Sequence, residues 1–68
     1  MTNTELLKQR MAESGYKIAF IAEKCGLTYQ GFLNKVKNKA EFKAGEIQSL
    51  CDLLGIDKDE KEAIFFCD

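Results

Sequence analysis

Proline and histidine are both absent from this chain of 68 residues. Proline breaks helices, so its absence, together with few glycines and many helix-forming residues, favours an all-α fold. No alternating run of apolar and polar residues, bounded by turn signals, predicts a strand. The length leaves room for one compact domain, which we expect to span residues 1–68.

The lack of histidine also limits the chemistry of the chain. Its cysteines, Cys25, Cys51 and Cys67, are too far apart for a CxxC pair, and no imidazole can complete a zinc site. A cysteine nucleophile would have no histidine base, and neither a glycine-rich phosphate loop nor a Gly-x-Ser-x-Gly turn is present. We therefore expect no enzyme activity, no metal, no cofactor and no small-molecule substrate. Cys25 and Cys51 fall on apolar faces and should act as small apolar residues.

Long hydrophobic runs are missing as well. No segment approaches the length of a transmembrane helix, and the first residues are polar, unlike those of a secretory leader. An odd number of cysteines without such a leader points to a reducing compartment. We expect a cytoplasmic protein with no membrane partner.

Apolar spacing predicts five helices, with ends uncertain by about 2–4 residues. They are Asn3–Ser14, Ile18–Cys25, Thr28–Lys37, Ala44–Leu54 and Lys58–Phe66. Thr2 with Glu5, and Asp57 with Glu60, have the spacing of capping boxes and predict the starts of the first and last helices. The expected core of the first and fourth helices consists of Leu7, Met11, Ile47, Leu50, Cys51 and Leu54.

The middle of the chain carries the most informative pattern. Four apolar residues have the i, i+3, i+4, i+7 spacing of one helical face, namely Ile18, Ile21, Ala22 and Cys25. Gly26 can then end the helix with a positive φ, and Thr28 can cap a second helix. Phe32 and Val36 return that helix to the core, and the small Ala22 lets the two helices cross closely. Two short helices around such a turn are typical of a helix-turn-helix that reads the major groove of DNA.

Ala22, Gly26, Leu27 and Phe32, in the run AEKCGLTYQGFLNKVKNK, resemble the helix-turn-helix of the lambda-repressor-like family of phage Cro proteins and repressors, the xenobiotic-response-element type. The later segments EFKAGEIQSLCDLLGI and EAIFF resemble small phage-encoded regulators of Gram-positive hosts. This resemblance implies a compact five-helix domain. The chain departs from the family pattern at Lys17 and Ile18, where a Ser or Thr cap and a phosphate-contacting Gln are usual.

The resemblance implies base-reading side chains at Tyr29, Gln30 and Asn34. Gln30 and Asn34 can each offer a donor and an acceptor to adenine. The Tyr29 ring could contact a thymine methyl, or the Tyr29 hydroxyl could bond a phosphate. The alternative is that the side chain packs against the turn. Phosphate contacts are expected from Lys17, Thr28, Lys35, Lys37, Asn38 and Lys39.

Gly31 is an unusual choice inside the second helix of this motif. A glycine there costs about 1 kcal/mol relative to alanine. We expect compensation either from a close approach of the DNA backbone or from tight packing against a neighbouring helix.

Charge is distributed unevenly along the chain. Residues 1–45 hold eight Lys and Arg against four Asp and Glu, and residues 46–68 hold two against seven, so the two parts carry formal charges of +4 and −5. The basic part would attract phosphate while the acidic part avoids it, which would orient the protein on DNA. The alternative is that the lysines after the second motif helix form a solvated face.

Four apolar residues do not fit the core of a single domain. They are Phe20, Leu33, Phe65 and Phe66. A second copy could cover them, with Phe65 or Phe66 at the interface of a homodimer. Alternatively, Phe20 and one of the two C-terminal phenylalanines could close a satellite cluster within the monomer.

Two functions therefore compete. The first is a sequence-specific transcriptional regulator that binds double-stranded operator DNA, as a homodimer, and blocks polymerase by occupying the site. The second is a protein-interaction module of the same fold, such as an antitoxin or anti-repressor, with the apolar C-terminus as its partner surface.

Overall fold

The computed structural model describes residues 1–66, which form five helices. They are α1 (Thr4–Ser14), α2 (Ile18–Lys24), α3 (Tyr29–Val36), α4 (Ala44–Leu54) and α5 (Lys58–Phe65). All five lie where the apolar spacing predicted them. Each difference at an end is a capping residue: Asn3, Cys25, Thr28, Lys37 or Phe66.

The start of α1 differs from the expected capping box. The cap is Asn3, whose Oδ1 accepts a hydrogen bond from the backbone N–H of Leu6 at 3.2 Å. Thr2 is instead buried, and its own backbone N–H donates to the side chain of Asn38. The prediction that Thr2 caps the helix was therefore wrong, because a tertiary contact takes this residue out of the capping position.

The start of α5 follows the sequence prediction in one respect. Asp57 Oδ1 accepts from the backbone N–H of Glu60 at 2.8 Å, as a cap should. The Glu60 side chain, however, lies beside α1, where its Oε2 is 3.3 Å from Arg10 Nε. Arg10 also pairs with Glu13 at 3.0 Å. This charged cluster ties α5 to α1.

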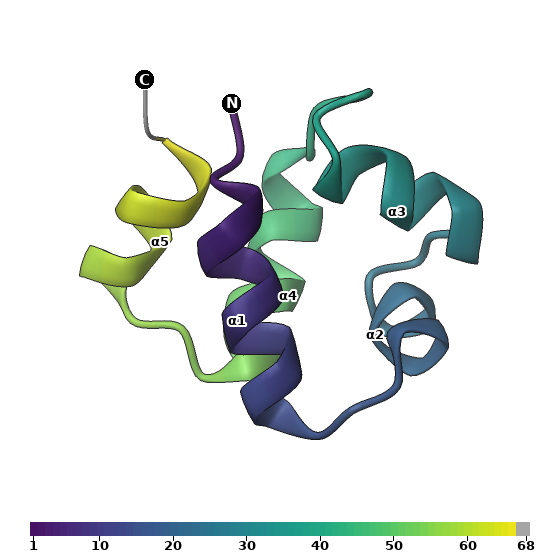
Figure 1. Cartoon of the computed structure of the whole chain (residues 1–68), viewed down its shortest axis with the longest axis horizontal. Coiled ribbons are helices and arrows are strands. Elements are labelled where there is room, and N and C mark those ends of the chain that lie inside the picture. Colours follow the sequence, from purple (N-terminus) through teal and green to yellow (C-terminus); the bar gives the residue numbers. More distant parts are fainter. Residues whose placement is uncertain (67–68) are drawn as a thin grey trace.

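The helices are arranged around α1, which crosses the middle of the molecule (Figure 1). α1 packs on α4 and α5, whereas α2 and α3 form the opposite side and α2 also packs on α4. The core residues of α1 and α4 are buried as predicted. In the part of the chain that the structure describes, no helix has the length and apolar character needed to span a membrane.

A chain of three aromatic rings extends this core. Phe42, in the loop before α4, lies edge-on to Phe32 at 6.0 Å and to Phe65 at 5.5 Å between ring centroids. Phe65 is only 5% exposed, whereas Phe66 is 61% exposed. Neighbouring residues of a helix point in directions about 100° apart, so only one of the two can face the core. Phe65 was predicted as an interface residue, and the structure corrects this by placing it inside the monomer.

Candidate nucleic-acid interface

The turn between α2 and α3 has the geometry that the sequence predicted. Gly26 has a φ of 75°, a left-handed conformation that favours glycine. The backbone N–H of Leu27 donates to the carbonyl of Ala22 at 2.9 Å, which closes the turn. Ala22 itself is 1% exposed, so its small side chain lies where α2 contacts its neighbours.

The first turn of α3 is held by Thr28. Its Oγ1 accepts from the backbone N–H of Gly31 at 3.0 Å, which confirms the predicted cap. A Cβ added at Gly31 would lie 2.9 Å from that same Oγ1 and would meet no neighbouring helix. Packing against another helix therefore does not explain Gly31. The residue leaves room for the cap oxygen of Thr28.

The outer face of α3 presents the three predicted base-reading side chains. Tyr29 is 52% exposed, Gln30 is exposed and Asn34 is half-buried. Gln30 Nε2 donates to Asn34 Oδ1 at 3.0 Å. This bond brings the two carboxamides together and leaves the Gln30 oxygen as an acceptor, and the Asn34 amide and the second N–H of Gln30 as donors, for an adenine edge.

Lys35 does not belong to this outer face. Its Nζ lies 2.6 Å from Glu46 Oε1 on α4, and the two side chains are only 13% and 14% exposed. Burial raises the pKa of Glu46, but hydrogen bonds from Lys35 and from the backbone N–H of Lys43 lower it by more, so the pKa lies below its ordinary value. The predicted phosphate contact of Lys35 is therefore corrected: this lysine ties α3 to α4.

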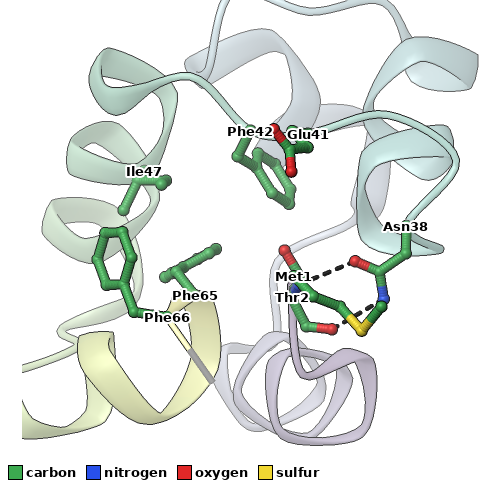
Figure 2. A pocket seen from close by; sticks show the side chains of 8 residues that line it. All are labelled: Met1, Thr2, Asn38, Glu41, Phe42, Ile47, Phe65 and Phe66. Carbon is green, nitrogen blue, oxygen red and sulfur yellow. Dashed lines mark hydrogen bonds between the residues drawn. The ribbon is translucent and has the colours of Figure 1, made fainter. Parts of the chain in front are cut away.

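Asn38 also has a structural role. Its backbone is left-handed, with a φ of 65°. Its Oδ1 accepts from the backbone N–H of Thr2, and its Nδ2 donates to the carbonyl of Thr2, both at 2.8 Å (Figure 2). Because this pair of bonds occupies the carboxamide, its predicted use for phosphate is corrected as well. Thr4 Oγ1, which donates to the carbonyl of Val36, strengthens the same junction.

The other predicted phosphate contacts remain accessible. Lys37 and Lys39 are exposed just past α3, and Lys17 is exposed at the start of α2. Lys17 occupies the N-cap position of α2 without a side-chain capping bond. The Lys17 side chain therefore does not cap the backbone N–H groups in the first turn of α2. The N-terminal end of this helix carries the positive charge of the lysine and the positive end of the helix dipole.

The unplaced apolar residues have separate surroundings. The Phe20 ring packs on Tyr16, with a centroid distance of 5.1 Å, and Lys24 Nζ lies 5.4 Å from the Phe20 centroid. A satellite cluster of Phe20 with Phe65 or Phe66 is not what the structure shows, since Phe65 packs on Phe42. Sequence reasoning missed Phe42. This residue follows Glu41 in the loop between α3 and α4, outside any segment with helical periodicity.

Among residues 1–66, no three His, Cys, Asp or Glu side chains are placed to hold a metal ion. Cys25 and Cys51 are free, and burial raises the pKa of both thiols. Cys67 lies outside the described residues.

Comparison with known proteins agrees with this geometry. Searches among curated proteins and among solved structures found no match. Residues 6–60 match the family model of the Cro/C1-type HTH DNA-binding domain, a match that covers α2, α3 and the turn between them. The chain belongs to the family of Cro/C1-type helix-turn-helix DNA-binding domains.

Proposed function

We propose that this protein is a sequence-specific transcriptional regulator similar to the small Cro proteins and repressors of phages. It binds an operator in double-stranded DNA and blocks polymerase by occupying the site. Membership of the DNA-binding family supports the general activity. The arrangement of side chains on α3 supports the finer proposal.

One observation carries this proposal, namely the hydrogen-bonded pair of Gln30 and Asn34 on the outer face of α3. The bond restricts the rotation of the two carboxamides, so less conformational freedom is lost when they meet a base edge, which favours discrimination between bases. Tyr29 precedes them at the first position of α3 and is 52% exposed. These three residues form the proposed base-reading set.

Phosphate contacts are proposed for Lys17, Lys37 and Lys39, with Thr28 at the start of α3. The three lysines lie at the two ends of the helix-turn-helix, so they can contact the DNA backbone on either side of α3. Thr28 contributes by capping α3, and its hydroxyl hydrogen is available to an acceptor. Lys35 and Asn38 are left out of this set because other contacts occupy them.

A homodimer is proposed to place two copies of α3 on the operator. Phe66 is 61% exposed at the end of α5, and Met1, which lines a pocket together with Phe66, is 76% exposed (Figure 2). Burial of this apolar surface against a second copy would stabilise the pair. Two-fold pairing would then place the two recognition helices about 34 Å apart, one turn of the duplex.

The direct test is selection of bound duplexes from a random pool. We expect a near-palindromic site, and we expect that the protein with both Gln30→Ala and Asn34→Ala enriches no site. Matched duplexes with a scrambled sequence serve as the control for binding to phosphate alone. Enrichment of the same site by the double variant would show that other residues read the bases.

A further inference from the structure

An apolar groove lies beside the helix-turn-helix. Its walls are formed by Met11 and Ala12 of α1, Ile18 at the start of α2, and Leu33 and Val36 of α3. Leu33, which the core does not fully cover, is therefore part of this groove. The groove is separate from the pocket near Phe66, which is lined by residues from both ends of the described chain and from the segment 38–47 (Figure 2).

The size of the groove restricts what it can hold. Its volume is about 230 Å³, below the range of roughly 300–1,000 Å³ that is usual for sites of drug-sized ligands and cofactors. A volume of this kind suits one or two apolar side chains of a protein partner. Proteins present such side chains from one face of an amphipathic helix.

The apolar surface continues beyond the groove. Tyr16 lines the groove and also packs on the Phe20 ring. Tyr16, Ile18 and Phe20 are 44%, 36% and 39% exposed, and they follow one another closely in the chain. Scattered exposed apolar residues are normal on a protein surface, but a contiguous patch next to a groove is typical of an interaction site.

The charged side chains that line the groove or contact the Phe20 ring are lysines. Lys8 is the one charged residue among those that line the groove. Lys17 lies between Tyr16 and Ile18, and Lys24 covers the Phe20 ring. The carboxylate of Glu13 on α1 is paired with Arg10. A partner with acidic residues beside its apolar anchor would therefore match this surface, and a basic partner would be repelled.

We propose that the groove between α1, α2 and α3 is the docking site of an acidic amphipathic helix from a protein partner. The helix inserts apolar side chains between Ile18 and Leu33, and its carboxylates face Lys8, Lys17 and Lys24. This docking site is distinct from the proposed base-reading face. The proposed function also assigns Lys17 a phosphate contact. If that assignment holds, the partner and DNA compete for this lysine, and this consequence alone rests on the proposed function.

The test uses a synthetic helical peptide with leucines along one face and glutamates on both flanks. A second peptide of the same pattern carries lysines in place of the glutamates. We expect the acidic peptide to bind and to shift the backbone amide signals of Ile18, Leu33 and Met11 in an NMR titration. We expect the basic peptide to bind at least about tenfold more weakly. Equal binding of the two peptides, or shifts centred on Phe66, would overturn the proposal.

Variants at Ala12 make the test specific, because this residue is exposed and lines the groove. We expect Ala12→Glu to lower the affinity for the acidic peptide at least about tenfold. Ala12→Gln should lower this affinity less, since only the glutamate adds a charge that repels the peptide. Ala63→Glu, at an exposed position of α5, is the control and should bind as the parent does. Equal effects of Ala12→Glu and Ala63→Glu would contradict the assigned site.

DNA binding by the same variants separates this proposal from the proposed function. Ala12 is on α1, outside the base-reading and phosphate sets, so Ala12→Glu should still bind DNA. Loss of peptide binding with intact DNA binding supports the groove. Groove signals that shift with the concentration of the protein alone would identify a second copy as the occupant and would overturn the proposed partner.

Discussion

Gln30 and Asn34 are the residues on which base recognition should depend most. Because a base contact carries discrimination and a phosphate contact does not, Gln30→Ala and Asn34→Ala should each lose about 1–3 kcal/mol of binding to the preferred duplex. Binding to a scrambled duplex should change little. Because Gln30 donates to Asn34, the two losses should not be additive. Titration of both duplexes checks this, and unchanged preference in both variants would exclude α3 as the reader.

Gly31 and Thr28 form a second pair whose effects on stability are coupled. Alanine at Gly31 would gain up to about 1 kcal/mol of helix propensity, but its Cβ would crowd the cap oxygen of Thr28. We therefore expect Gly31→Ala to change the free energy of unfolding little in the parent, and to stabilise the Thr28→Ala variant. Thr28→Ala alone should cost about 1 kcal/mol. Denaturant unfolding of the four proteins measures the coupling, and an equal effect of Gly31→Ala in both backgrounds would refute it.

The orientation of α3 is set by contacts with other elements at its C-terminal half. Lys35 ties α3 to α4 through Glu46, and Asn38 ties the residues after α3 to Thr2. Both contacts are satisfied without DNA. The helix is therefore oriented before it binds, which lowers the conformational entropy lost on binding.

The Lys35–Glu46 pair should make stability depend on pH. The folded protein holds the pKa of Glu46 below its ordinary value, so the unfolded chain binds more protons in that range. This contribution is present above the ordinary pKa of 4.5 and is lost as the pH falls through the lower folded value. We expect Glu46→Gln to reduce the loss of stability in acid. Unfolding measured from neutral pH downward tests this, with the exposed Glu62→Gln as the control.

The exposed lysines that flank α3 should determine the salt dependence of DNA binding. Each phosphate that a lysine neutralises releases counterions and contributes a slope of about −0.9 in log affinity against log salt. We expect Lys37→Ala to flatten this slope by about one such unit. Lys58→Ala, at an exposed position of the acidic α5, should leave the slope unchanged. An identical slope for Lys37→Ala and the parent would remove Lys37 from the interface.

Positive and negative charge are concentrated in different parts of the molecule. The residues up to Gly45 carry +4, and they include α2 and α3, whereas the residues from Glu46 carry −5 and include α5. A net charge of −1 therefore does not oppose DNA binding, because the field at the helix-turn-helix differs from that at α5.

Self-association should distinguish the two C-terminal phenylalanines. Phe66 is exposed, so Phe66→Ser should leave the fold intact and weaken the proposed dimer by about 1.5–3 kcal/mol. Phe65→Ser should instead destabilise the monomer, by about 3–5 kcal/mol, because it removes a ring from the core. Sedimentation and thermal unfolding of both variants separate these effects. A parent that stays monomeric at high concentration, and binds DNA as one copy, would rule out this dimer.

Local relations along the chain determined much of this protein. The five helices, the turn at Gly26, and the caps at Thr28 and Asp57 depend on residues no more than about one helical turn apart, so their spacing alone predicted them. The exposed outer face of α3 followed from the same periodicity. The family resemblance added the expected role of that face.

Only the tertiary structure decided which side chains are left for DNA or for a partner. Lys35 bonds a residue 11 positions away, and Asn38 bonds one 36 positions away, so no local pattern could show that either is occupied. Likewise, periodicity could not choose between Phe65 and Phe66, since the choice depends on the position of Phe42. Burial and pairing are set by elements that meet in space, and this chain brings them together only when α1, α3, α4 and α5 pack.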